Sequence, residues 1–336
     1  MGNSIVALIG SESLLAREIR DLAAEGAGLS LKLIAADEEP AGALTRVGDE
    51  PAIVVPLNAA SLSEARAVVL AGSEESAKKA LHLLGDPPDA AVIDLTYTAE
   101  ERPDARLRAP MLEGGGSLDD AGEAAVHVIA HPAAIAIALL LRRLHRNDPI
   151  RRAVIQILAP ASEHGATGVE ELQQQTVSLL SFKNLPKDVF DAQLSFNLLA
   201  RYGEKAPAPL EESELRVERH LASLLAMEGE GEGAPMPSIR MIQAPVFHGY
   251  SFSAWVEFEE APGIEAIESS LTTEGIEVRG GEFEPPTNVG QAGQSGIAVG
   301  AISPDRNHAE AYWFWFVADN LRLHAENAVM VALQVV

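Results

Sequence analysis

Short apolar runs alternate with helical patterns from the start of the chain to about residue 144. Five runs are apolar enough to be buried strands of a parallel sheet, at residues 4–10, 31–35, 67–70, 91–95 and 124–130. Between them, apolar residues recur at helical spacing, as at Leu15 and Ile19, and residues 133–144 form a strongly apolar helical stretch. Strands that alternate with helices in this way predict a doubly wound parallel sheet.

The pattern changes in the second half of the chain. Here apolar positions alternate or are β-branched and aromatic, which predicts strands at residues 152–158, 239–244, 250–259, 296–302 and 311–318. Helical spacing returns at 168–180 and 211–225, and Asp319 begins a final helix. The second half is therefore expected to be an α+β domain with a mixed or antiparallel sheet.

Charge and hydropathy narrow the classes of partner. The 336 residues carry a net charge of −24, which argues against nucleic acids and anionic membranes as partners. We find no charge-free apolar run of the length that a bilayer requires and no signal peptide, so we expect a cytoplasmic protein without a membrane partner. The chain has no cysteine, which excludes disulfides, thiolate metal ligands and a cysteine nucleophile.

Eight short segments, in order along the whole chain, resemble the aspartate-semialdehyde dehydrogenase family. They are VALIG (6–10), VIDL (92–95), AHP (130–132), GATGVEEL (165–172), FNLLA (196–200), APVFHGYS (244–251), VADNLR (317–322) and NAV (327–329). The stretches FDAQLSFNLLA and IQAPVF look especially like the Usg-type branch, whose members are paralogues of the enzyme.

The resemblance implies a particular domain organisation. Residues 1–131 with 319–336 are expected to form a Rossmann-type, NAD(P)-binding domain, and residues 132–318 a dimerisation domain of the semialdehyde dehydrogenase type. It also implies a homodimer, with a paralogous dehydrogenase subunit as an alternative partner.

The reaction of the family places a cysteine nucleophile and a histidine base on two of these segments. The nucleophile position corresponds to Ala134 here, and the base position to Tyr250. A methyl group cannot attack a carbonyl, and tyrosine, with an ordinary pKa near 10, is a poor base at neutral pH. The polar side chains that remain near the family's cleft are Glu211, Gln243, His131, His164 and His248. The three histidines, with Glu163 and Glu214, are the residues that could bind a metal, but we expect none because their spacing matches no ligand motif.

The cations that would bind an acyl phosphate are also replaced. By resemblance, arginine positions fall at Gln243 and Glu100, and the lysine of a Glu-x-x-Lys pair falls at Glu214. A dianionic substrate should therefore not bind here.

The glycine turn that binds the cofactor in the family is degraded. Of its three glycines, Gly10 alone remains, and Glu12 would place a carboxylate beside the cofactor phosphates. The acidic segment around Asp37 excludes NADP on charge grounds and leaves NAD open. We expect no cofactor, and the weak candidates for one are Gly10, Asp37, Gly72 and Asn320.

Two functions remain open. The first is a catalytically inactive, dimeric homologue of aspartate-semialdehyde dehydrogenase with a scaffold or regulatory role. The alternative is an oxidoreductase or ligand sensor that acts on an aldehyde or oxo group with NAD by altered chemistry.

Overall fold

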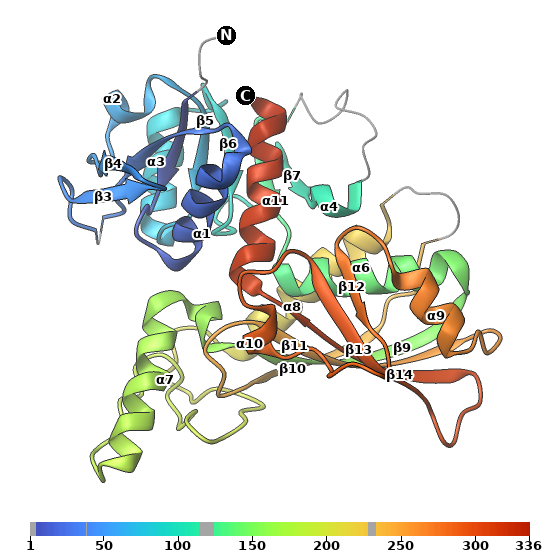
Figure 1. Cartoon of the computed structure of the whole chain (residues 1–336). Coiled ribbons are helices and arrows are strands. Elements are labelled where there is room, and N and C mark those ends of the chain that lie inside the picture. Colours follow the sequence, from blue (N-terminus) through green and yellow to red (C-terminus); the bar gives the residue numbers. More distant parts are fainter. Residues whose placement is uncertain (1–4, 38, 114–123, 228–232) are drawn as a thin grey trace. The chain divides into compact units, whose positions relative to one another are not determined.

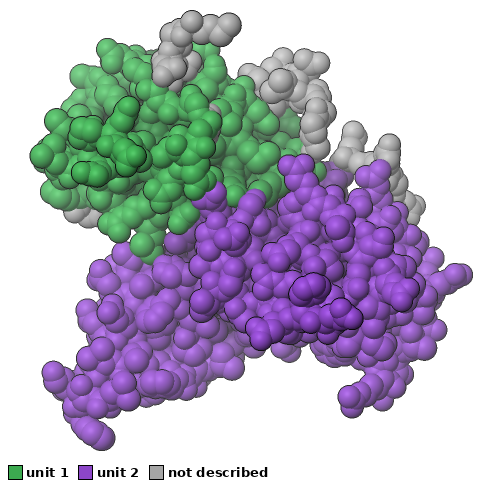
Figure 2. All heavy atoms as spheres, viewed as in Figure 1, with its two compact units in different colours: residues 1–130, 324–336 green, residues 131–323 purple. Residues whose placement is uncertain are grey.

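The computed structural model describes residues 5–37, 39–113, 124–227 and 233–336. The chain forms two compact units (Figure 1). Unit 1 comprises Met1–Ala130 with His324–Val336, and unit 2 comprises His131–Leu323 (Figure 2). Each unit contains its own six-stranded sheet.

The sheet of unit 1 is parallel throughout. In spatial order its strands are β2 (Ser30–Ile34), β1 (Ile5–Ile9), β5 (Ala65–Leu70), β6 (Ala91–Asp94), β8 (Val126–Ile129) and β7 (Ala105–Arg108). The order reverses at β1, as it does in doubly wound folds. The predicted fold class of this half of the chain is confirmed.

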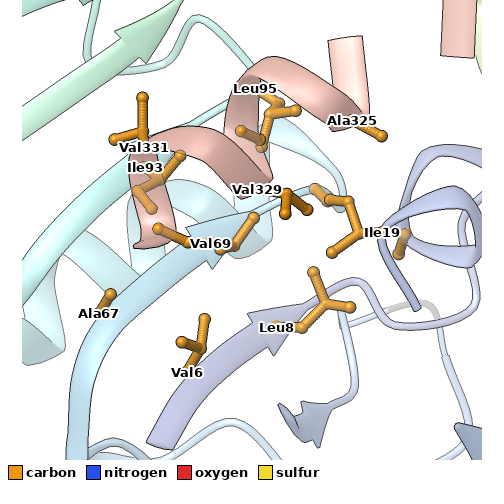
Figure 3. Packing of buried hydrophobic residues seen from close by; sticks show 14 of the residues in the cluster. Val6, Leu8, Ile19, Ala67, Val69, Ile93, Leu95, Ala325, Val329 and Val331 are labelled. Atoms are coloured by element: carbon orange, nitrogen blue, oxygen red, sulfur yellow. The ribbon is translucent and has the colours of Figure 1, made fainter. Parts of the chain in front are cut away.

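Both faces of this sheet are buried, because successive residues of β1 point to opposite sides. Val6 and Leu8 join a hydrophobic cluster with two helices on one face (Figure 3). Ala7 and Ile9 join a second cluster with two helices on the other face. The helices are α1 (Leu14–Leu22) and α11 (Asn320–Val335) on the first face and α2 (Ala59–Leu62) and α3 (Glu74–Leu84) on the second.

Several short elements of unit 1 were not predicted from the sequence. They are a hairpin of β3 (Leu44–Val47) and β4 (Glu50–Ile53), the helices α2 (Ala59–Leu62) and α4 (Pro110–Glu113), the π-helical turn η1 (Ala23–Ala27) and strand β7. The hairpin leaves Leu44 and Ile53 exposed. Val47 and Ala52 are partly buried against the core, but strands of four residues with their largest apolar side chains exposed show no clear hydrophobic alternation.

The sheet of unit 2 is mixed, which confirms the second prediction. Its order is β10 (Ser238–Gln243), β9 (Ile150–Ala159), β11 (Tyr250–Phe258), β14 (Ala311–Ala318), β13 (Ile297–Pro304) and β12 (Ile276–Arg279). The three central pairings are antiparallel and the two outer ones are parallel.

One helix lies at the centre of unit 2. Helix α6 (Pro132–Asn147) is apolar around most of its surface, as expected of a helix that packs on several sides. Among the described residues, no helix is both long and apolar enough to cross a membrane. The other helices of the unit are η2 (Ala161–His164), α7 (Gly165–Leu180), α8 (Leu210–Leu225), α9 (Ile264–Leu271) and α10 (Asn288–Gln291).

The aromatic strand β14 divides its side chains between the two faces of the sheet. Phe314 and Phe316 are buried, and the Phe316 ring stacks on Phe252 of β11 with centroids 4.3 Å apart. Trp313 points the other way and is 43% exposed. The outer face of this sheet therefore carries aromatic surface that the helices of the unit leave uncovered.

A long connection without strands or helices, residues 181–209, is fixed to α7 by buried side chains. The Gln175 amide oxygen accepts the N–H groups of Leu194 (2.7 Å) and Ser195 (3.1 Å). Its amide nitrogen donates to the carbonyl of Ala192 at 2.9 Å. Glu171, one turn earlier on α7, accepts the N–H of Val189 at 2.6 Å. These two side chains thus satisfy backbone groups of a segment that forms no helix or sheet.

Candidate functional site

The position predicted for the family nucleophile lies in the first turn of α6. His131 caps this helix, because its Nδ1 accepts the N–H of Ala133 at 3.2 Å. Its own N–H donates to Nδ1 of His220 on α8 at 2.8 Å. Pro132 follows at the first helical position, where its missing N–H costs nothing. Ala134 is fully buried and offers only its methyl group.

The base position, Tyr250 at the start of β11, belongs to a buried hydrogen-bond network. The Tyr250 hydroxyl donates to one carboxylate oxygen of Glu163 at 2.5 Å. The other oxygen of Glu163 lies 2.8 Å from Nε2 of His131. Tyr250 and His131 are fully buried, and the Glu163 side chain is 15% exposed. We call this set the His131–Glu163–Tyr250 network.

The charge of Glu163 is stabilised by its partners. Burial alone would raise the pKa of this carboxyl, but the attraction of His131 and the hydrogen bonds from His131 and Tyr250 outweigh burial and lower the pKa to about 2. Glu163 is therefore ionised at neutral pH. A carboxylate with so low a pKa is a weak base, so this network is better suited to holding three elements together than to abstracting a proton.

A second buried chain begins at the next residue. His164 Nε2 lies 2.8 Å from the Tyr202 hydroxyl, which donates to the Gln243 amide oxygen at 2.6 Å. The Gln243 amide nitrogen donates to the carbonyl of Ala159 at 2.9 Å. Burial lowers the pKa of His164 and raises the pKa of Tyr202, so both side chains are neutral. The position predicted for a substrate arginine is thus filled by a neutral amide whose hydrogen bonds stay within the protein.

Two of the predicted site residues, Glu211 and His248, belong to neither of these hydrogen-bonded chains. Glu211 is exposed in the first turn of α8. It lines a cavity of about 630 Å³ together with Tyr202, Glu214 and Arg240. His248 is half-buried in the turn before β11, where its carbonyl accepts from the Asn288 side chain.

The described residues offer no metal centre. Within the described part of the chain, no three His, Asp or Glu side chains are grouped so that they could hold an ion. His131 and His164 serve the two separate hydrogen-bonded chains instead.

Ser162 and Asn320 are paired with each other. The Ser162 hydroxyl lies 3.2 Å from the side-chain oxygen of Asn320, which also accepts the N–H of Gly249 at 2.9 Å. Asn320, predicted as a weak cofactor position, therefore ties η2 and the turn before β11 to the start of α11. Ser162 is hydrogen-bonded to an amide rather than to an imidazole, which leaves it without a base to activate it.

In unit 1, the two predicted cofactor glycines pack on each other. Gly10 has a φ of +78°, and a Cβ placed on it would lie 2.2 Å from Cα of Gly72. A Cβ on Gly72 would lie 3.0 Å from Cα of Gly10. Both glycines are required by the close crossing of the chain after β1 and β5, whether or not a ligand binds. Asp37, the third candidate, forms a 2.6 Å ion pair with Lys79.

The turn after β1 does not fit the pyrophosphate of the nicotinamide dinucleotide that the resemblance implies. Such a turn must offer free N–H groups to an anion. Here the N–H of Glu12 already donates to the Glu39 carboxylate at 2.9 Å, and the side chain of Glu12 adds a second negative charge.

Comparison with known proteins places the chain in a family. The family described as "Semialdehyde dehydrogenase, dimerisation domain" matches residues 141–323. A USG-1 protein homolog of Pseudomonas aeruginosa is 33% identical over 247 residues, which cover 72% of this chain and 70% of the relative. The chain belongs to the semialdehyde dehydrogenase family. The family and the Usg-type branch predicted from the sequence are thereby confirmed.

Other members of the semialdehyde dehydrogenase family agree with this assignment. An aspartate-semialdehyde dehydrogenase of Rickettsia bellii is 29% identical over 220 residues, which cover 62% of each chain. The fold matches the crystal structure of aspartate semialdehyde dehydrogenase II from Vibrio cholerae with a TM-score of 0.83. That match has 21% identity and covers 99% of this chain and 98% of the other, so it establishes the shared fold alone.

Glu163, the central residue of the unit 2 network, was predicted to lie near the family's cleft, but its partners His131 and Tyr250 were not predicted. It corresponds to a loop position of the family and has no spacing signal of its own. Tyr202 and His220 were missed for the same reason, because each meets its partner from a distant segment. The one usable signal was indirect: a tyrosine at the base position needs a buried partner for its hydroxyl.

Proposed function

We propose that this chain is a catalytically inactive, dimeric member of the semialdehyde dehydrogenase family with a scaffold or regulatory role. The observation that carries the proposal is the His131–Glu163–Tyr250 network beside Ala134. Ala134, at the nucleophile position, is buried, and the chain contains no cysteine. The Tyr250 hydroxyl, at the base position, donates its hydrogen bond to the Glu163 carboxylate. The family's covalent reaction needs both a thiolate and a base.

The charges near the lost nucleophile support the same proposal. An acyl phosphate requires cations. Gln243 is neutral, and Glu211 and Glu214 place two carboxylates along the neighbouring cavity. Glu214 already accepts a hydrogen bond from Arg240 at 3.3 Å, so that cation is partly neutralised.

The test is a semialdehyde oxidation assay with phosphate and either NAD or NADP, run beside an active dehydrogenase of the family. We expect no turnover above the blank. The Ala134→Cys variant should remain inactive as well, because it restores the thiol without the base or the cations. Turnover of the wild-type chain well above the blank would overturn the proposal.

The dimeric part of the proposal is supported by the outer face of the unit 2 sheet. Val154, Trp255 and Trp313 lie opposite one another on β9, β11 and β14 and form a continuous apolar row. Asp305 accepts the indole N–H groups of both tryptophans, at 3.0 and 2.9 Å, which fixes the two rings. A rigid apolar row of this kind suits an interface with a second copy of the chain or with a paralogous subunit.

Sedimentation of the Trp313→Glu variant tests this interface. Burying the new carboxylate without a partner should shift the protein from dimer to monomer at micromolar concentration. Leu44→Glu, at an exposed apolar residue of the unit 1 hairpin, is the matched control and should leave the dimer intact. A Trp313→Glu variant that stays dimeric would argue against this face as the interface. Mixing with a paralogous dehydrogenase then distinguishes homodimers from mixed dimers.

The cavity at Glu211 favours a second candidate function. In this alternative the chain is a ligand sensor, or an oxidoreductase of altered chemistry that acts on an aldehyde or oxo group with NAD. Its volume of about 630 Å³ is sufficient for a small molecule, and Tyr202, Glu214 and Arg240 supply polar groups. A thermal-shift screen of aldehydes and oxo acids, with and without NAD, tests it. Stabilisation that is lost in Glu211→Gln would favour this candidate over the first.

A further inference from the structure

The turn between β1 and α1 holds a carboxylate of its own chain. Glu39, which follows β2 in unit 1, uses both carboxylate oxygens. One accepts the N–H of Glu12 in the turn at 2.9 Å, and the other accepts the N–H of Ala36 at 3.0 Å. A half-buried carboxylate at the start of a helix also interacts favourably with the helix dipole. Glu39 thus has the charge and the hydrogen bonds that a bound anion would have at this turn.

Three other N–H groups of the turn donate to backbone carbonyls, so Glu12 supplies the N–H that the carboxylate occupies. The N–H groups of Gly10 and Ser11 donate to the carbonyl of Ile34 at 3.0 and 3.4 Å, and the N–H of Ser13 donates to the carbonyl of Gly10 at 3.0 Å. The fully buried Ser11 hydroxyl has no hydrogen-bond partner among the described residues. It would be an additional donor for an anion if the Glu39 carboxylate were absent.

The cations around the turn are paired with carboxylates. Arg20 Nη1 lies 2.9 Å from the Glu12 carboxylate and also donates to the carbonyl of Ser11 at 3.0 Å. Its other terminal nitrogen donates to the Thr45 hydroxyl of the β3–β4 hairpin at 2.9 Å. Lys79 is paired with Asp37. A phosphate group approaching this turn would therefore meet two carboxylates, Glu12 and Glu39, and two cations, Arg20 and Lys79, that are already paired with Glu12 and Asp37.

We propose that Glu39 is a built-in ligand of an anion-binding turn, so that unit 1 keeps the phosphate-binding backbone but excludes phosphate from it. A carboxylate tethered in the same chain has an effective concentration in the millimolar range or above, which a weakly bound free anion cannot match. The proposal concerns unit 1 and does not rest on the loss of chemistry in unit 2. The two can therefore fail separately.

Calorimetric titration with inorganic pyrophosphate, and separately with NAD, tests the exclusion. We expect no binding by the wild-type chain at about 1 mM and at least about a tenfold lower Kd for Glu39→Ala. The double variant Glu12→Ala with Glu39→Ala should bind pyrophosphate more tightly again, because it also loses the repulsion by Glu12. Glu64→Ala is the matched control, since Glu64 is an exposed carboxylate of the same unit with one long ion pair, 3.7 Å from Lys32. It should behave as the wild type does.

The amide proton of Glu12 provides a measurement that does not depend on an added anion. In the wild-type chain, its hydrogen bond to Glu39 should slow its exchange with solvent. In Glu39→Ala that protection should be lost, whereas Glu64→Ala should keep it. The proposal is overturned if wild type and Glu39→Ala bind pyrophosphate equally, or if the Glu12 amide exchanges at the same rate in both.

Discussion

Replacing Glu163 by glutamine removes the charge at the centre of the His131–Glu163–Tyr250 network while keeping its shape. The pKa of the Glu163 carboxyl falls from its ordinary value of 4.5 to about 2 in the folded protein. At about 1.4 kcal/mol per unit, this shift contributes about 3 kcal/mol to the stability of unit 2 at pH 7.

The sign of the pH dependence follows from the direction of the shift. Because the folded-state pKa is the lower one, the stabilisation is complete above pH 4.5 and is lost as the pH falls toward 2. Glu163→Gln lacks this contribution at every pH. The free energies of unfolding of wild type and variant should therefore differ by about 3 kcal/mol at pH 7 and by about 1 kcal/mol at pH 3.

Urea unfolding followed by tryptophan fluorescence is the appropriate assay. The three tryptophans of the chain, Trp255, Trp313 and Trp315, all lie in unit 2, so fluorescence reports on that unit. Glu212→Gln is the control, because this half-exposed side chain pairs with Arg216 at 3.4 Å and should change stability by less than about 0.5 kcal/mol. A difference between wild type and Glu163→Gln that is the same at pH 7 and pH 3 would refute the reasoning.

Three further predictions follow from buried contacts. Gly10→Ala should destabilise unit 1 by at least about 3 kcal/mol, measured by amide hydrogen exchange of β1, because the new Cβ would lie 2.2 Å from Gly72 Cα at a positive φ. Arg108→Met should cost about 3–5 kcal/mol and increase exchange in α4, because Arg108, 1% exposed, holds Glu113 at 2.7 Å and Gln334 at 2.6 Å. Gln175→Leu should make residues 181–209 cleavable by protease, whereas exposed Gln173→Leu should not, since Gln175 supplies hydrogen bonds that fix this segment.

The two units share one feature, a carboxylate that accepts hydrogen bonds from polar groups of its own unit. In unit 2 the Glu163 carboxylate accepts a hydrogen bond from the Tyr250 hydroxyl and contacts Nε2 of His131, and in unit 1 the Glu39 carboxylate accepts the N–H of Glu12. Buried polar groups without partners cost several kcal/mol, so these internal partners stabilise the fold.

Local pattern was sufficient to predict the architecture. The strand at β1 and the helix at α6 are encoded by continuous apolar runs, and the strands of unit 2 by β-branched and aromatic alternation. The missing cysteine and the alanine at position 134 were visible in the sequence as well, because the absence of a reactive atom does not depend on geometry. Short elements such as β3 and β4 were missed, since each has four residues, is at most partly buried, and carries no clear apolar pattern.

The contacts of Glu163 and Glu39 could be seen only in the tertiary structure. Glu163 meets His131 and Tyr250 across 32 and 87 positions of sequence, and Glu39 meets Glu12 across 27. Such contacts depend on where the folded chain places sheet edges and helix ends. The hydrophobic pattern of one segment does not predict which distant segment will lie beside it. The sequence by itself therefore determined the fold class and the loss of the nucleophile. Only the folded chain determined which side chains form hydrogen bonds with Tyr250, His131 and the N–H of Glu12.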